Sequence, residues 1–241
     1  MLQKHIDKAK DIIKNTKFLA IMTGAGISAE SDIPTFRGED GLWKNYRAEE
    51  LATPEAFNRN PEIVWEWYNW RRDIIGSKNP NPAHYACVNL ENRYNDNFSI
   101  ITQNVDGLHK KAGSIRVCEI HGNIWEVRCL ECGSVYYEEE KLDDKPKCKK
   151  CLTGFLRPNV VWFGESLDPK VLSKTDEVLN SCDTLLIIGT SGIVYPAAAF
   201  YQIAKSNGAK VIEINPATTP SQSSFDCVIK GKAGEVLPLI V

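Results

Sequence analysis

Short hydrophobic runs recur along the chain, and stretches with helical periodicity separate them. The runs lie at residues 18–22, 98–104, 183–191 and 210–215, and two of the helical stretches cover 81–94 and 195–208. Continuous apolar strands that alternate with helices are typical of a parallel sheet whose two faces are both covered. We therefore expect a doubly wound, Rossmann-like α/β core that carries its functional loops at the carboxyl ends of the strands.

Two segments interrupt this alternation. Residues 34–75 hold loops and helices without a convincing strand, and residues 126–156 are short, polar and cysteine-bearing. We interpret both as insertions that together form a smaller lobe, the first a cofactor loop with a helical insertion and the second a zinc-binding insertion. The nucleotide-binding core then consists of residues 1–33, 76–125 and 157–241.

Composition and charge disfavour several classes of protein. The chain has 241 residues, of which 43% are hydrophobic and 25% are charged, and its formal net charge is -2. No basic run is long enough to follow a phosphate backbone, and no apolar run is long enough to cross a bilayer. The amphipathic first segment lacks the apolar core of a signal peptide. We expect a cytoplasmic protein that binds neither nucleic acid nor membrane, and a monomer, since no exposed apolar helix is left unassigned.

A glycine-rich loop directly follows the first hydrophobic run. GAGISA, at residues 24–29, fits the pattern G-x-G-x-x-G/A, in which Gly24 permits a tight turn and Gly26 lets the backbone approach a pyrophosphate. Amide groups at the start of the following helix would then face the phosphates. Glycine turns after strands often bind nothing, but the position of this loop favours a nucleotide.

The dinucleotide fingerprint is incomplete in one respect. The usual second strand, which ends about 20 residues on in a ribose-binding acid, is missing. In its place the chain has SDIPTFRGEDGLW, a loop with a single arginine, Arg37. A dinucleotide must therefore lie differently here from one in a hydride-transferring dehydrogenase. Asn215, at the end of KVIEIN, can hydrogen-bond a ribose from another strand.

Four of the eight cysteines form two close pairs. The pair Cys129 and Cys132 is separated from the pair Cys148 and Cys151 by 15 residues, a spacing typical of four-thiolate zinc sites. Four sulfur ligands leave no open position on a tetrahedral ion, so we expect one structural Zn²⁺. The remaining cysteines lie in apolar patterns and are expected in the core; they are Cys87, Cys118, Cys182 and Cys227.

Polar side chains that can carry chemistry follow two further strands. Asn104 ends the run at 98–104 and Asp106 comes just after it, and His121, in EIHG, follows another apolar run. Open α/β sheets place their ligands at such strand ends. A lone histidine is more often structural than catalytic, but Gly122 permits close backbone approach and a neutral imidazole accepts a proton near pH 7.

Taken in order, the motifs resemble a known family. GAGISAES, IPTFRG, TQNVDGLH, EIHG, the paired cysteines, VVWFGE, GTS and EIN run from Gly24 to the C-terminal region as in the sirtuins, which are NAD-dependent protein lysine deacylases. The resemblance implies a cleft between two lobes, which NAD enters from one side and an acylated lysine from the other. It also implies nicotinamide, free lysine and 2′-O-acyl-ADP-ribose as the products.

The resemblance further implies a role for each matching residue. It makes His121 the base, Asp106 the partner of the nicotinamide amide, Asn104 and Gln103 ribose-region residues, and Phe36 the shield of the reacting face. The residues implied to line the dinucleotide are Gly24, Ala25, Gly26, Arg37, Gly189, Thr190, Ser191, Asn215 and Ala233. An acylated peptide would bind as an added strand between VVWFGE and GIVYP, and the residues implied to contact it are Val161, Phe163, Gly164 and Glu165.

One departure from the family concerns Asp32, where glycine is usual. If this position needs a positive φ, aspartate is among the better-tolerated substitutes. If it contacts phosphate, a carboxylate would weaken NAD binding. We expect the first, because Arg37 and the later motif residues are intact.

The segment ATPEAFNRNPEIVWEWYNWRR resembles the sirtuin branch that prefers succinyl, malonyl and glutaryl groups. In that branch a Tyr-x-x-Arg pair grips the distal carboxylate and a small alanine widens the pocket; here these are Tyr68, Arg71 and Ala52. The chemistry agrees, because a carboxylate that enters an apolar tunnel needs a charge-assisted partner. Arg72 lies about 100° further round the helix and is expected in solvent.

Other interpretations stay open at this point. Arg71 as a surface residue, with Tyr68 in the core, would leave an enzyme that is mainly a deacetylase. A mono-ADP-ribosyltransferase would cleave the same nicotinamide bond. A zinc-ribbon interaction module on a nucleotide-sensing domain would bind NAD without releasing nicotinamide.

Overall fold

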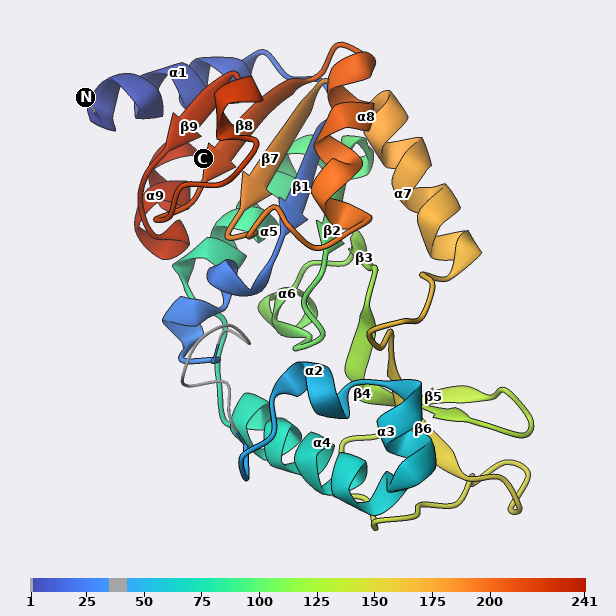
Figure 1. The fold of residues 1–241 in the computed structure, drawn as a ribbon. Coiled ribbons are helices and arrows are strands. Elements are labelled where there is room, and N and C mark those ends of the chain that lie inside the picture. Colours follow the sequence, from blue (N-terminus) through green and yellow to red (C-terminus); the bar gives the residue numbers. More distant parts are fainter. Residues whose placement is uncertain (1, 35–42) are drawn as a thin grey trace.

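The computed structural model describes residues 2–34 and 43–241 and contains a six-stranded, wholly parallel sheet in the order β3-β2-β1-β7-β8-β9 (Figure 1). Its strands are β1 (Leu19–Thr23), β2 (Phe98–Thr102), β3 (Val117–Glu119), β7 (Thr184–Ile188), β8 (Lys210–Ile214) and β9 (Cys227–Ile229). The predicted doubly wound α/β core is confirmed. Of the two edge strands, β3 corresponds to the apolar run expected before His121. The other, β9, was not predicted as a strand, because three residues carry too little pattern to be distinguished from a loop.

The strand order reverses at β1. From β1 the chain builds β2 and β3 on one side and later β7, β8 and β9 on the other. The register is level, because Thr23 at the end of β1 lies opposite both Thr102 and Ile188. Loops from the carboxyl ends of these three strands therefore leave the sheet side by side, at the topological switch point where such sheets bind ligands.

Helices cover both faces of this sheet (Figure 1). On one face lie α1 (Leu2–Lys14), α5 (Pro82–Tyr94) and α9 (Ala233–Ile240), and on the other lie α7 (Pro169–Ser181) and α8 (Phe200–Ser206). Alternate residues of β1 serve the two layers: Leu19 and Ile21 pack in one apolar cluster, and Ala20 and Met22 in the other. A strand buried on both sides needs no polar alternation, which explains its continuous apolar sequence.

The four cysteines expected in the core are all buried, as predicted; they are Cys87, Cys118, Cys182 and Cys227. Among the described residues, no helix combines the length and the apolar character needed to cross a bilayer.

A smaller lobe lies beyond the carboxyl ends of the strands (Figure 1). Its elements are α2 (Ala48–Leu51), α3 (Pro54–Arg59), α4 (Pro61–Gly76) and an antiparallel sheet in the order β5-β4-β6, formed by β4 (Gly122–Cys129), β5 (Val135–Tyr137) and β6 (Leu156–Val160). The helices and this sheet share one apolar cluster, in which the indole N–H of Trp65 on α4 donates to the carbonyl of Leu156 on β6 at 3.1 Å. The two inserted segments thus pack together.

The glycine loop differs from the expected helix start. Two 3₁₀ turns follow β1, η1 (Ala25–Ile27) and η2 (Ala29–Ser31). The amide of Gly26 donates sideways to the carbonyl of Gly189 at 2.9 Å, which ties the loop to the end of β7. The expectation of a helix that starts here is therefore wrong. The loop ends at Asp32, whose φ of 55° is left-handed and whose side chain is 88% exposed, as expected for a residue that substitutes for glycine on conformational grounds.

Candidate active site

The glycine loop and the loop after β7 pack backbone against backbone. An ideal Cβ on Gly26 would lie 2.6 Å from the Cα of Gly189, and one on Gly189, whose φ is +60°, would lie 2.5 Å from the amide nitrogen of Ile27. On Gly24 it would lie 2.9 Å from the Gly189 carbonyl oxygen. Glycine is therefore required at these positions for two reasons. The loops contact each other too closely for a side chain, and the motif predicts that a phosphate approaches the same main chain. Because glycines have no side chains, the two paired loops expose main-chain atoms. A bound pyrophosphate needs such close access to the main chain.

Behind this loop lies a buried network centred on Ser28. Its hydroxyl donates to the Asp106 carboxylate at 2.8 Å and accepts from the side-chain amide of Asn104 at 3.1 Å. The same amide donates to the Gly24 carbonyl at 3.1 Å. The other oxygen of Asp106 accepts from the amide of Leu108 at 2.9 Å. The structure therefore joins two predicted site residues through a serine that the sequence analysis did not single out.

Asp106 has a perturbed acidity. Burial raises the pKa of its carboxyl, while the hydrogen bonds from Leu108 and Ser28 and the positive charge of Arg71 act in the opposite direction. A carboxyl that is 7% exposed and fixed by two donors presents a defined hydrogen-bonding group to the space in front of it.

His121 follows β3, at the junction between the two sheets. Its Nδ1 lies 3.0 Å from the carbonyl oxygen of Gln103. A carbonyl only accepts, so Nδ1 carries the hydrogen and Nε2 of the neutral ring carries the lone pair. Burial lowers the pKa of the imidazole, against the opposing effect of the Gln103 hydrogen bond. The ring is thus neutral at pH 7 and can accept a proton at Nε2.

Close packing also places His121 next to one of the predicted peptide-binding segments. The carbonyl of His121 accepts from the amide of Val161 at 2.9 Å. At Gly122, φ is +79° and an ideal Cβ would lie 2.1 Å from the Asn159 carbonyl oxygen, so only glycine fits there. Gly122 lets β4 and β6 meet directly behind the imidazole.

The remaining predicted dinucleotide residues lie at the ends of the outer strands or in neighbouring loops. Asn215 donates to the Thr190 carbonyl at 2.6 Å and accepts from the amide of Ala217 at 3.1 Å. The side chain therefore fixes the loop after β7. Ala233 starts α9, and the next amide, that of Gly234, donates to Glu30 at 2.6 Å. Ala25 and Ser191 are half-buried beside these loops. Phe36 and Arg37 lie outside the described residues.

The predicted acyl pocket lies between α4 and the segment after β6. Tyr68 is 1% exposed and its hydroxyl accepts from the indole N–H of Trp162 at 2.9 Å. The Arg71 guanidinium lies 4.8 Å from the ring centre of Trp67 and 5.6 Å from that of Tyr68. Arg71 is only 8% exposed, and burial lowers its pKa to about 10, so it stays charged at neutral pH. The surface alternative for Arg71 is wrong.

Ala52 anchors the segment that would receive a peptide. Its carbonyl accepts from the amide of Phe163 at 2.9 Å, and its own side chain is buried in the small-lobe cluster. Val161 is half-buried and Phe163 is 51% exposed. Gly164 has φ +86° and no atom within 4 Å of an ideal Cβ, so open space lies beside it. The segment 192–196 likewise exposes apolar side chains, those of Ile193 and Tyr195.

Glu165, predicted as a substrate contact, forms an ion pair within the chain. Its two oxygens accept from both terminal nitrogens of Arg157, at 2.6 and 2.9 Å, and one of them also accepts from the amide of Trp162 at 2.9 Å. Arg157 in turn lies 3.4 Å from the ring centre of Trp162. In this structure the carboxylate holds the 160–165 segment in shape, and Arg157 and Trp162 are functional candidates that the motif reading missed.

Arg72 is not in solvent, and that prediction is wrong. It is 4% exposed, and its terminal nitrogens donate to the backbone carbonyls of Glu138 and Glu140. The reason is that the zinc-bearing insertion covers the side of α4 that would face solvent if the helix were considered alone. Burial lowers the pKa of Arg72 as well.

The four paired cysteines meet at one point. Their sulfur atoms all lie within 4.8 Å of one another, with Cys129 and Cys151 3.6 Å apart and Cys132 and Cys148 3.8 Å apart. Zinc–sulfur bonds of about 2.3 Å in a tetrahedron require sulfurs about 3.8 Å apart. An ideal Cβ on Gly154 would lie 2.4 Å from the Cys129 sulfur. The cluster fits a structural Zn²⁺ with four thiolates.

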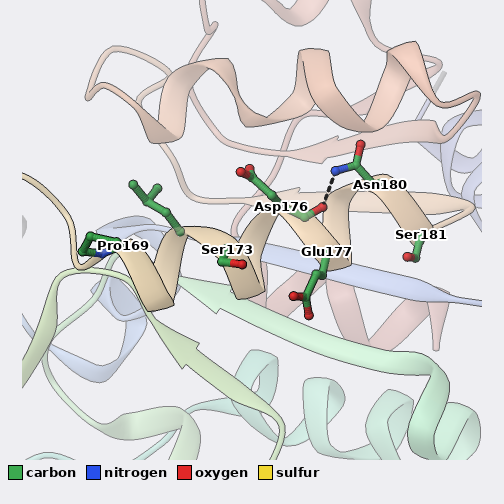
Figure 2. A pocket seen from close by; sticks show the side chains of 7 residues that line it. Pro169, Ser173, Asp176, Glu177, Asn180 and Ser181 are labelled. Carbon is green, nitrogen blue, oxygen red and sulfur yellow. Dashed lines mark hydrogen bonds between the residues drawn. The ribbon is translucent and has the colours of Figure 1, made fainter.

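A shallow hollow of about 640 Å³ lies along α7, away from all of these residues (Figure 2). Its lining comes from one helix and includes Pro169, Ser173, Asp176, Glu177, Asn180 and Ser181. The Asn180 side chain is bonded to the Asp176 carbonyl. None of these residues belongs to the predicted site, so the hollow is not part of it.

Two of the missed residues left a signal in the sequence. Ser28 lies inside the glycine loop, where a hydroxyl at a strand end is a candidate ligand, and Trp162 lies inside VVWFGE. Arg157 left none, because its partner Glu165 is eight residues away in an irregular segment.

Comparison with known proteins agrees with this geometry. Residues 24–196 match the family described as the Sir2 family. A protein of Aquifex aeolicus named NAD-dependent protein deacylase is 54% identical over 217 residues, which cover 89% of this chain and 90% of that protein.

Two solved structures are also similar. A Sir2 homologue in complex with NAD has a TM-score of 0.91 and 46% identity, covering 97% of this chain and 92% of that one. Sir2Af2 bound to a myristoylated histone peptide has a TM-score of 0.78 and 38% identity, covering 99% and 95%. The family match and the identity to the Aquifex protein, each over most of the chain, show that this protein belongs to the Sir2 family.

Proposed function

We propose that this chain, as an NAD-dependent protein lysine deacylase, prefers succinyl, malonyl and glutaryl groups, removes acetyl groups more slowly, and yields nicotinamide and 2′-O-acyl-ADP-ribose. Membership of the Sir2 family and the deacylase name of a relative 54% identical to it support the general activity. The observation that carries the preference is the buried Arg71 guanidinium beside Tyr68.

Burial in an aromatic pocket raises the free energy of a charged arginine, and it lowers the pKa of Arg71 for this reason. An acyl group that ends in a carboxylate would supply the opposite charge and a planar pair of acceptors that match the guanidinium fork. The same carboxylate would not enter an apolar tunnel without such a partner. An acetyl group ends in a methyl group, which offers Arg71 neither a charge nor an acceptor, so it gains nothing from Arg71.

The residues at the strand ends would perform the NAD chemistry. His121, with Nε2 as acceptor, is placed to take a proton from a ribose hydroxyl, after the amide oxygen of the acyl-lysine has displaced nicotinamide. Asp106 and Asn104, fixed by Ser28, would hold the nicotinamide amide and the ribose. The facing main chain of the Gly24–Gly26 and Gly189 loops fits the pyrophosphate. NAD would be consumed in this reaction, as a co-substrate.

The acylated peptide would add as a strand between residues 161–164 and 192–196. Exposed apolar side chains flank this position, namely Phe163, Ile193 and Tyr195. Recognition of the peptide through its main chain would leave little preference for its sequence. The acyl-lysine stem would then pass between Val161 and Phe163 toward Arg71.

The direct test is a panel of acetyl-, succinyl-, malonyl- and glutaryl-lysine peptides of one sequence, incubated with and without NAD. The proposal expects nicotinamide release that depends on both NAD and the acyl group, with kcat/KM for the acidic groups at least about tenfold above that for acetyl. Mass spectrometry of the peptide distinguishes loss of the acyl group from gain of ADP-ribose. Equal rates on acetyl and succinyl peptides would contradict the preference, and ADP-ribosylated product would contradict the deacylase.

A further inference from the structure

Trp125 belongs to the small lobe but contacts a loop of the large one. It lies on β4, and its indole N–H donates to the backbone carbonyl of Asp106 at 3.0 Å. One residue earlier, the amide of Ile124 donates to the carbonyl of Val105 at 2.9 Å. These two bonds tie β4 to the segment that carries Asp106.

The indole ring fills the space between this segment and the end of α4. At Gly107, where φ is +77°, an ideal Cβ would lie 3.3 Å from Cδ1 of Trp125. At Gly76, the last residue of α4, it would lie 3.3 Å from Cη2 at the far end of the ring. Both neighbours are glycines in contact with the ring. The main chain around Asp106 therefore rests on the indole, while the Asp106 carboxylate is held separately by Ser28 and Leu108.

A second set of contacts connects Trp125 to the zinc cluster. The Arg72 guanidinium lies 5.4 Å from the Trp125 ring centre and donates to the carbonyl of Glu138. The amide of Glu138 donates to the Trp125 carbonyl at 2.7 Å. The Glu138 carboxylate pairs with Lys149, which lies directly after the zinc ligand Cys148. A continuous chain of contacts thus runs from the metal loop to Asp106.

We propose that Trp125 is a positioning residue, which sets the position of Asp106 for the nicotinamide end of NAD and makes that position depend on the packing of the zinc-bearing lobe. The inference rests on the proposed function, because it assumes that Asp106 faces nicotinamide. It gives the zinc-bearing insertion a role beyond its own folding: the small lobe holds part of the NAD site in place.

The test compares Trp125→Phe with Trp70→Phe. The second change removes an indole from the same lobe, at a half-buried position where the ring centre lies 6.2 Å from that of Trp43. Measurements are KM for NAD, KM for the acyl-peptide, inhibition by nicotinamide, and zinc content per chain. We expect Trp125→Phe to raise KM for NAD and the inhibition constant for nicotinamide about fivefold, the effect of one lost hydrogen bond, with KM for the peptide and zinc content unchanged.

A second variant, Arg72→Lys, keeps the charge but loses the planar fork that spans the two carbonyls. It should shift KM for NAD in the same direction by a smaller factor. An unchanged KM for NAD in Trp125→Phe, an equal rise in both KM values, or loss of zinc would each contradict the proposal. Failure of the proposed function would look different, because wild-type and Trp70→Phe proteins would then release no nicotinamide.

Discussion

The Nδ1 atom of His121 lies 3.0 Å from the backbone carbonyl of Gln103, and this contact decides which nitrogen of the ring can act as a base. Because Gln103 follows β2 and His121 follows β3, the ends of two neighbouring parallel strands supply the proposed base and the group that orients it. No third side chain is needed to fix the tautomer.

Replacement of His121 by alanine should remove the base without disturbing either binding site. We expect kcat to fall by about 10²–10⁴, with NAD binding close to wild type, because the side chain does not contribute to the glycine loop or the Ser28 network. Single-turnover assays and calorimetric titration with NAD would separate the two quantities. A His121→Ala protein that keeps its turnover would show that the proton goes elsewhere.

The pH profile provides an independent check on His121. Burial lowers the pKa of the imidazole, so the neutral, competent form persists below pH 6.5, the ordinary pKa of histidine. Activity should therefore be on its plateau at pH 7 and decline only as the pH falls below 6.5, as the ring gains a proton. The acidic limb of kcat/KM measures this pKa. An acidic limb with its midpoint above pH 7 would contradict the lowered pKa.

Removal of zinc should disorder the small lobe before it affects the parallel sheet. The four sulfurs converge within 4.8 Å, and four thiolates crowded together without a cation repel one another, so metal binding is coupled to folding. We expect one zinc ion per chain by elemental analysis, and a loss of tryptophan ellipticity and of activity on chelation. Recovery on adding Zn²⁺ is the control. Full activity in a zinc-free protein would exclude the structural role.

The ion pair between Arg157 and Glu165 should control peptide binding more than NAD binding. Arg157 has 5% of its side chain exposed and Glu165 23%, so breaking the pair leaves a buried charge at a cost of about 3–5 kcal/mol at most, reduced by the partial exposure of Glu165. Glu165→Gln, which keeps the shape, should raise KM for the acyl-peptide several-fold and leave KM for NAD near wild type. Glu177→Gln, on α7, is a suitable control.

The fold could be predicted well because its strands are buried on both faces. The runs that form β1, β2, β7 and β8 are continuously apolar, without alternating polar residues, and helical segments separate them. The three-residue edge strand β9 carries no such pattern. The glycine loop was recognised from its spacing, but its 3₁₀ turns depend on the hydrogen bond from Gly26 to Gly189, a contact across 163 residues that local sequence does not contain.

The candidate site was predictable where a motif lies at the end of a strand. It was less predictable where the two inserted segments pack against each other. Helical spacing places Tyr68 and Arg71 on one face of α4, and the family resemblance implied a pocket there, but the sequence left open whether Arg71 is buried. Burial of Arg72 was not predicted, since a helix considered alone has a solvent side, whereas α4 is covered on both sides by the small lobe. The partners of Ser28 are distant in the sequence, and the partner of Arg157 lies at a spacing that fits no regular element. Only the folded structure shows these contacts.

The proposed preference for acidic acyl groups rests on the Arg71 side chain, and Arg71→Met tests it at nearly constant volume. Succinyl-lysine should lose its charge-assisted partner, at a cost of about 1.5–3 kcal/mol, while acetyl-lysine loses only packing. Arg59→Met, at an exposed position of the same lobe, is the matched control.

The most direct measurement is the ratio of kcat/KM for succinyl- and acetyl-peptides of one sequence, determined for wild type, Arg71→Met and Arg59→Met. The proposed function predicts a ratio of at least about ten in wild type and in Arg59→Met, which falls at least about tenfold in Arg71→Met, chiefly through the succinyl-peptide. A ratio that Arg71→Met leaves unchanged, with both activities reduced equally or not at all, would contradict the role of Arg71.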